Sequence, residues 1–222
     1  MLGRTHALSG SVLWLAASPT LAHLTHGTLD GPSLALGAVV CAGAALLPDL
    51  DDSGGTLSHA LGPVSDLLTK AVAKLSGGHR HATHSLTFAA ASGVGTWALV
   101  AYVSRWAMLA LVLALVAAAL RATDLIATAG WPRCWVTAAA IIALAGWRLP
   151  GPWSWLPWAV VLGCLAHLAG DLLTPRGIRL LWPLGWRVEA PLVDITTGTW
   201  RETRVIAPVL GLAMLWLGWI RL

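Results

Sequence analysis

The stretch WAMLALVLALVAAAL, Trp106–Leu120, contains no charged residue and no Gly or Pro. A helix that crosses a bilayer needs roughly 20 apolar residues, and small flanking residues can extend a shorter stretch to that length. Six other apolar stretches accompany it, at about Ala7–Leu24, Ser33–Leu47, Leu86–Ser104, Cys134–Trp147, Trp153–Leu173 and Val205–Ile220. The sequence therefore predicts an all-α, polytopic membrane helix bundle with seven spans, or with six if the second or fifth stretch is re-entrant.

The composition excludes an ordinary soluble domain. Charged residues make up 11% of the 222 residues and apolar residues 57%, against about 25% charged residues in a typical soluble protein. The mean hydropathy is +0.72, and 14 Trp residues are typical of a protein anchored at bilayer interfaces. The net charge of +4 is small, so the basic residues indicate topology rather than nucleic-acid binding, and the expected partners are membrane lipids.

The three cysteines, Cys41, Cys134 and Cys164, lie in or beside apolar stretches without a CxxC pair, so we expect them to be buried and free. The first stretch also resembles a signal peptide. Because the rest of the chain is polytopic as well, we expect an uncleaved first span.

One membrane-embedded domain is expected over residues 1–222, with polar loops at 48–85 and 174–204. In the first loop, Val64–Leu75 has apolar residues at helical spacing, and Lys70 and Lys74 suit a short amphipathic helix at the interface.

Basic residues predict the orientation of the bundle. With a cytoplasmic N-terminus, only Arg105, Arg148 and Arg221 lie outside. Eleven lie inside: Arg4, Lys70, Lys74, Arg80, Arg121, Arg133, Arg176, Arg179, Arg187, Arg201 and Arg204. The positive-inside rule favours this arrangement, which also gathers the most conspicuous polar motifs at the cytoplasmic face.

Two carboxylates follow the second apolar stretch directly. Pro48 disfavours helix at the preceding residue, so the chain is expected to leave the helix there. In an extended turn Asp49 and Asp51 can point the same way and bind one divalent ion or bridge two. A solvated turn after a helix is the alternative interpretation.

The motif HRHATHS, residues 79–85, precedes the third stretch. Its three imidazoles favour a metal site, because neutral imidazole is the commonest protein metal ligand; histidines lying at headgroup level are the alternative. Arg80 offers a planar fork suited to phosphate or carboxylate. Ser85 is suited to cap the helix that begins at Leu86, whose first N–H groups can also face an anion.

His167 and Asp171 lie four residues apart near the end of the sixth stretch, on one face of a helix. Both can bind a metal, Asp171 can orient His167, or the pair can simply pack two helices. Seven residues at one face supply nitrogen and oxygen ligands, enough for two ions: His6, Asp49, Asp51, His79, His84, His167 and Asp171. Such a set without Cys suits Zn, Mn or Fe and can activate water near neutral pH.

The chain resembles the YdjM-like family of bacterial inner-membrane proteins at several separated motifs. These are Thr5-His6, LLPDLD at 46–51, HRHATHS at 79–85 and HLAGDLLTPRGIRLLWP at 167–183. They occur in the family's order. His81 and Asp52 depart from the pattern, in which Gly and His are common at these positions.

The resemblance implies the same seven metal ligands, with Arg80 and Ser85 beside them and Thr174 and Gly177 closing the last motif. It also implies metal-dependent hydrolysis. A more distant similarity to the zinc-dependent phospholipase C and nuclease superfamily suggests phosphoester chemistry.

The expected function is therefore hydrolysis of a phosphoester in a lipid or lipid-linked substrate, at the cytoplasmic face of the bacterial inner membrane. One or two divalent ions are expected, zinc first and manganese or iron next. Arg80 would stabilise developing charge and Asp51 would take or relay a proton, with Ser85 counted beside them as catalytic. A metal-ion or proton transporter and a non-catalytic scaffold with a structural metal are the alternatives.

Overall fold

The structure is a computed structural model that describes residues 1–25, 29–124, 130–148, 153–189 and 196–222. These residues form the helices α1 (Gly3–Leu24), α2 (Gly31–Ala44), α3 (Pro63–Ser76), α4 (Leu86–Tyr102), α5 (Arg105–Ala122), α6 (Trp131–Arg148), α7 (Leu156–Leu172) and α8 (Ala207–Arg221). Short helical turns add η1 (Leu47–Asp51), η2 (Ala82–His84) and η3 (Glu202–Ile206). Within the described ranges the β structure is a single bridge between Ile178 and Val188. The all-α prediction is confirmed.

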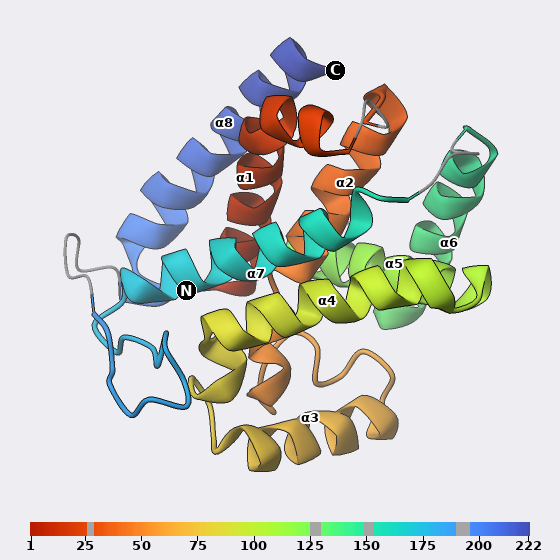
Figure 1. Cartoon of the computed structure of the whole chain (residues 1–222). Coiled ribbons are helices and arrows are strands. Elements are labelled where there is room, and N and C mark those ends of the chain that lie inside the picture. The colour runs from red at the N-terminus through yellow and green to blue at the C-terminus, as the bar shows by residue number, and fades with distance from the viewer. Residues whose placement is uncertain (26–28, 125–129, 149–152, 190–195) are drawn as a thin grey trace.

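Helix α2 lies at the centre of the bundle and packs against α1, α5 and α7 (Figure 1). Helix α7 also contacts α1 and α4, α6 packs on α5, and α8 packs on α1. Trp14, Val40, Val112 and Leu156 are fully buried in the apolar core between these helices. The Trp14 ring N–H donates to the carbonyl of Leu34 at 2.9 Å, so the buried indole keeps its polar atom paired. The three cysteines are buried and free, as expected.

The lengths and surfaces of the helices fit a bilayer. Among the described residues, three segments are long and apolar enough to cross a membrane: Gly31–Asp51, Arg105–Ala122 and Glu202–Arg221. Shorter apolar helices occupy Leu86–Tyr102, Trp131–Leu144 and Leu156–Leu172. Only 6% of the apolar stretch within Glu202–Arg221 is buried inside the protein. Such a large exposed apolar surface indicates contact with lipid.

The predicted amphipathic helix is confirmed as α3, which lies across one end of the bundle (Figure 1). Its apolar residues Leu67 and Leu75 are 71% and 86% exposed. Helix α3 packs against η1, while its apolar face is open. This arrangement suits a helix that lies in the membrane interface.

The prediction of an extended turn after Pro48 is wrong. Helix α2 ends at Ala44, and Leu47–Asp51 form a 3₁₀ turn with Pro48 near its start. Proline is compatible with the first turn of a helix because its missing N–H would have no partner there. At three residues per turn, Asp49 and Asp51 point in different directions, and they reach the polar residues around them from two sides.

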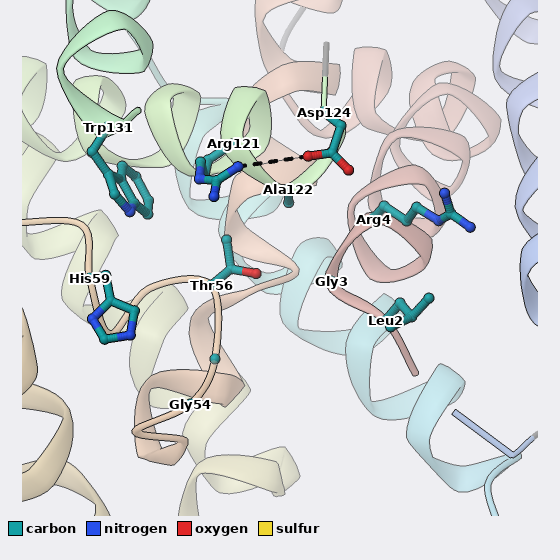
Figure 2. A pocket seen from close by; sticks show the side chains of 11 residues that line it. Leu2, Gly3, Arg4, Gly54, Thr56, His59, Arg121, Ala122, Asp124 and Trp131 are labelled. Atoms are coloured by element: carbon teal, nitrogen blue, oxygen red, sulfur yellow. Dashed lines mark ion pairs between the residues drawn. The ribbon is translucent and has the colours of Figure 1, made fainter. Parts of the chain in front are cut away.

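Four chain segments carry the polar motifs to one end of the bundle, where two polar pockets lie. One, of about 490 Å³, borders the predicted metal ligands. The other, of about 620 Å³, lies between the start of α1, the residues after η1, the end of α5 and the start of α6 (Figure 2).

Candidate metal centre

The structure brings all seven predicted ligands together. His6 lies on the first turns of α1, Asp49 and Asp51 lie on η1, and His79 and His84 lie between α3 and α4. His167 and Asp171 lie on the last turns of α7. Three overlapping groups have ligand atoms within 4.8 Å of one another. These are Asp49, Asp51, His79 and His84; His6, Asp49 and His167; and His84, His167 and Asp171.

Four donor atoms form the centre of this cluster. The Nε2 atoms of His84 and His167 are 3.2 Å apart. Asp49 Oδ1 lies 3.5 Å from His84 Nε2 and 3.6 Å from His167 Nε2. Asp171 Oδ2 lies at the same two distances from these nitrogens. Atoms that bind one zinc ion at about 2.0–2.1 Å are about 3.0–3.4 Å apart, so the two nitrogens have the spacing of a shared ion, and the carboxylate oxygens at 3.5–3.6 Å are slightly farther from them than such a site needs.

The orientation of His167 is set by the backbone of α2. Its Nδ1 lies 2.7 Å from the carbonyl oxygen of Ala45. Because a carbonyl only accepts, Nδ1 carries the proton and the lone pair of Nε2 faces the cluster. This contact needs α2 and α7 to be close, which Gly163 allows: a Cβ there would lie 2.6 Å from the carbonyl oxygen of Cys41.

His6 is buried beside the cluster with both ring nitrogens unpaired among the described residues. Its ring stacks on His167 with centroids 3.8 Å apart, and the residue is 1% exposed. Neither ring nitrogen has a hydrogen-bond partner within the described part of the chain, although Nε2 lies 3.4 Å from Asp171 Oδ1. A buried polar group without a partner costs about 1–3 kcal/mol. A metal bound at one of these nitrogens would remove part of that cost.

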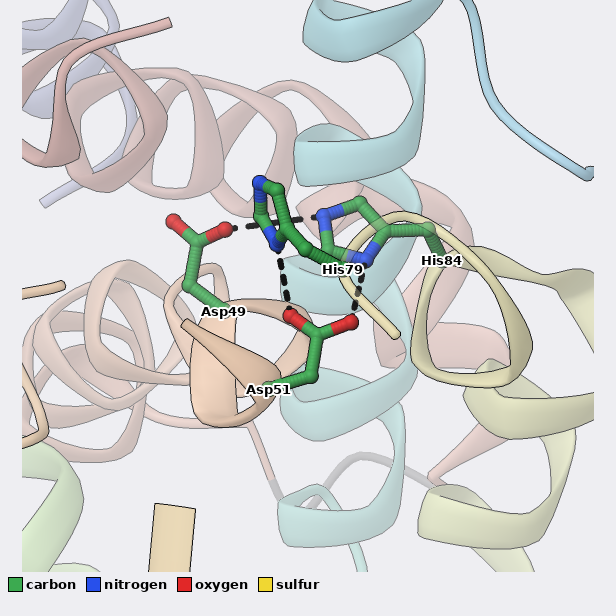
Figure 3. Close-up of side chains that lie close together, drawn as sticks. All are labelled: Asp49, Asp51, His79 and His84. Atoms are coloured by element: carbon green, nitrogen blue, oxygen red, sulfur yellow. Dashed lines mark hydrogen bonds and ion pairs between the residues drawn. The ribbon is translucent and has the colours of Figure 1, made fainter. Parts of the chain in front are cut away.

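Asp51 connects His79 to His84 (Figure 3). One carboxylate oxygen lies 2.8 Å from His79 Nδ1. The other accepts from the Thr83 hydroxyl at 2.5 Å and lies 3.5 Å from His84 Nδ1. This contact leaves His84 Nε2 directed at Asp49.

The cluster also changes the acidity of His84. Burial by itself lowers the pKa of His84, but hydrogen bonds and charges from Asp49 and Asp51 outweigh it and raise that pKa from 6.5 to about 9. Without a metal, the protonated imidazole offsets carboxylate charge. A metal that binds Nε2 must displace that proton.

Arg80 is fixed beside the cluster. Its guanidinium contacts Asp171 Oδ2 at 3.1 Å and donates to the Thr174 hydroxyl at 2.8 Å. Its backbone N–H donates to Asp51 at 3.1 Å, and its φ of 63° is uncommon for a residue other than glycine. The residue is 8% exposed, and its buried Nε has no hydrogen-bond partner in the described segments.

The 490 Å³ pocket gives this cluster access to solvent. It is lined by Met1, His6, Asp49, Asp52, His79, Arg80, Asp171, Thr174, Pro175, Arg176, Thr196 and Thr197. Two arginines therefore face a space bordered by four of the predicted metal ligands.

Two residues of the HRHATHS motif lie apart from the metal cluster. The Ser85 hydroxyl donates to the carbonyl of Ala82 at 2.6 Å and accepts from the N–H of Phe88 at 3.1 Å, so it caps α4. His81 contacts the carbonyl of Gly77 through Nδ1. The catalytic role of Ser85 stays a prediction.

Glu202 is a buried polar residue that sequence reasoning did not select. It is fully buried and accepts from the backbone N–H groups of Leu2 at 2.6 Å and Gly198 at 2.7 Å. It thereby connects the residues before α8 to the start of α1, where His6 lies. The only sequence signal is an acidic residue directly before the last apolar stretch.

The family model described as YdjM inner membrane protein matches residues 1–222. The chain belongs to the YdjM family. Similar curated proteins are "Inner membrane protein YdjM" of Escherichia coli (strain K12) and of Shigella flexneri. Each is 36% identical over 72 residues, which is 32% of this chain and 35% of the relative. The matched segment thus spans about a third of the length of these relatives. No solved structure matches the chain.

Proposed function

We propose that this protein is a membrane-embedded, metal-dependent hydrolase that cleaves a phosphoester in a lipid or lipid-linked substrate. The observation that carries the proposal is that the Nε2 atoms of His84 and His167 lie 3.2 Å apart and that one oxygen each of Asp49 and Asp171 lies 3.5–3.6 Å from both, next to a buried His6 whose ring nitrogens have no hydrogen-bond partner in the described residues. The pocket beside them is open and contains two arginines.

The residues that would hold a first ion are His84, His167, Asp49 and Asp171, with His6 next to them. Two imidazoles and two carboxylates suit zinc first and manganese or iron next. The chemistry that such an ion supplies is polarisation of a phosphoryl oxygen and activation of water near neutral pH. Asp51, which lies 3.5 Å from His84 Nδ1, would orient that ligand.

Arg80 would bind the substrate phosphate. Its guanidinium is already held by Asp171 and Thr174, so little side-chain freedom is lost when an anion arrives. The fork can then stabilise negative charge that grows on the phosphoryl oxygens.

His79 and Asp51 would move the proton. The His79 side chain is 37% exposed and lines the pocket, while Asp51 is fully buried behind it at 2.8 Å. His79 Nε2 would take a proton from water, and Asp51 would stabilise the resulting imidazolium. The exposed edge of His79 would release the proton to solvent.

The position of the cluster favours hydrolysis over transport. The donors lie on the first turns of α1, on η1 after α2 and on the last turns of α7, whereas transporter sites typically lie near the bilayer midplane. We place this end of the bundle at the cytoplasmic face of the inner membrane, from the excess of basic residues there. A lipid headgroup would then reach the pocket from the adjacent leaflet.

The test combines metal content with phosphodiester hydrolysis on one preparation. Protein purified in detergent is expected to contain zinc, manganese or iron and to hydrolyse bis(p-nitrophenyl) phosphate. Asp49→Ala and His84→Ala should each lose metal and activity together. His81→Ala is the matched control, because His81 belongs to the same motif and lies outside the cluster.

The outcomes separate the three functions. Bound metal with no hydrolysis of this probe or of bacterial lipid vesicles would support the structural scaffold. Metal flux into proteoliposomes without hydrolysis would support transport. Wild-type protein free of metal after mild purification would contradict the proposal.

A further inference from the structure

A second polar pocket lies on the other face of α1. It has a volume of about 620 Å³, and Figure 2 shows lining residues from the start of α1, the segment after η1, the end of α5 and the start of α6. The polar and aromatic lining residues are Arg4, Thr56, His59, Arg121, Asp124 and Trp131. Arg4 precedes His6 by two positions, which is about 200° around the helix. This pocket is therefore separate from the metal centre.

An apolar groove continues from this pocket along the helices. It has a volume of about 600 Å³, and Arg4 lines it as well. Its apolar lining includes Leu8, Val39, Leu120, Ile141 and Met214, from α1, α2, α5, α6 and α8. On α5, Leu120 faces the groove and Arg121 faces the polar pocket, so the two spaces adjoin at the end of that helix.

The two spaces follow one another along α6, as the headgroup and acyl chain of a lipid would. On α6, Trp131 lines the polar pocket and Ile141 lines the groove. Ten residues of helix separate them, or about 15 Å at 1.5 Å per residue. The hydrocarbon core is about 30 Å thick, so about 15 Å matches the length of an acyl chain in one leaflet.

The charge of the polar pocket favours an anion. Arg121 faces Asp124 at 3.7 Å, with both side chains partly exposed. Arg4 has no hydrogen bond or ion pair in the described ranges, and its Nε is buried. Arg4, Arg121 and Asp124 together leave one positive charge, which complements the single negative charge of a phosphodiester.

We propose that the polar pocket and the apolar groove together bind one anionic glycerophospholipid. Its phosphate lies in the polar pocket that Arg4 and Arg121 line, and an acyl chain follows Leu8 toward Ile141. The site is independent of the proposed hydrolase activity, because it shares no residue with the metal centre.

Lipid titration by native mass spectrometry tests the site. The detergent-solubilised protein is titrated with dioleoyl phosphatidylglycerol and with dioleoyl phosphatidylcholine. The anionic lipid is expected to bind about tenfold more tightly. Arg4→Gln should weaken its binding about five- to tenfold, and Leu8→Trp, which fills the groove, should weaken both lipids.

Two further variants separate the site from loss of folding and from general surface charge. Asp124→Asn removes a negative charge from the pocket and should tighten phosphatidylglycerol binding severalfold, which an unfolded protein cannot do. Arg133→Gln is the matched control, because exposed Arg133 follows Trp131 on α6 and lines neither space. Its binding should equal that of the wild type.

Three results would overturn the proposal. The first is equal binding of the two lipids. The second is an Arg4→Gln protein that binds phosphatidylglycerol as the Arg133→Gln control does. The third is glycerol 3-phosphate binding as tightly as the lipid, which would show a phosphate site without an acyl-chain groove.

Discussion

Replacing Gly163 by Ala tests whether the close approach of α2 and α7 holds the metal centre together. The new Cβ would lie 2.6 Å from both the Cys41 carbonyl oxygen and the Ala44 Cβ. Since ordinary contacts need about 3.5 Å, the two helices must separate by about 1 Å. The Ala45 carbonyl, now 2.7 Å from His167 Nδ1, would then move to the limit of hydrogen bonding. Overpacking of this kind costs about 1–3 kcal/mol, and loss of an orienting contact typically weakens metal binding about 10- to 100-fold.

The assay is a zinc affinity measured by competition with a chelator, together with thermal unfolding of the same sample. Gly211→Ala is the matched control, because nothing lies within 4 Å of a Cβ at that position on α8. It should bind zinc as the wild type does and be as stable or slightly more stable, since Ala favours helix over Gly by up to about 1 kcal/mol. If Gly163→Ala binds zinc as tightly as Gly211→Ala, the helix approach is not what orients His167.

Three further results are expected. Arg80→Lys should keep its metal but lower phosphodiester hydrolysis about 10- to 1000-fold, because Lys loses the planar fork; an unchanged rate with intact metal would remove Arg80 from the mechanism. Zinc affinity should rise about tenfold per pH unit from pH 7 toward 9 and then level off, because His84, with a pKa of about 9, must lose a proton to bind. A flat profile in competitive titrations at pH 7, 8 and 9 would contradict that ligand assignment. Cysteines placed within Thr56–Ser58 and within Arg176–Arg179 should react with an impermeant maleimide from the same, cytoplasmic side. Labelling from opposite sides would show that the two loops do not lie at one face of the membrane.

The helices could be predicted because the bilayer restricts what a long apolar stretch can do. Each of the seven stretches lies on a helix, and the helical spacing in Val64–Leu75 identified α3 as well. The prediction of an extended turn after α2 was wrong because two effects of proline compete. Pro48 restricts the residue before it, but it also fits the start of a 3₁₀ turn, and the packing of η1 against α3 favours the second outcome.

The predicted ligands gathered at one end because ionisable residues near membrane-spanning helices are few and costly. Sequence reasoning could not find the groups that orient them. The partner of His167 is a backbone carbonyl, and every residue has one. Ala45 becomes the partner only because Gly163 brings two helices together. Thr83 and Glu202 act through hydrogen bonds whose partners are distant in sequence or depend on a local turn.

The apolar core and the metal centre are built from different parts of the same helices, and this separation makes the site testable. On α2, fully buried Val40 belongs to the core, whereas Asp49 lies two to three helical turns further along the chain and beyond the end of that helix. Removing a carboxylate there leaves the packing around Val40 and Trp14 in place, and it relieves a cluster that contains three carboxylates close together. Loss of metal in Asp49→Ala can therefore be interpreted as loss of a ligand. The same reasoning does not hold for Gly163, where ligand orientation and core packing depend on one contact.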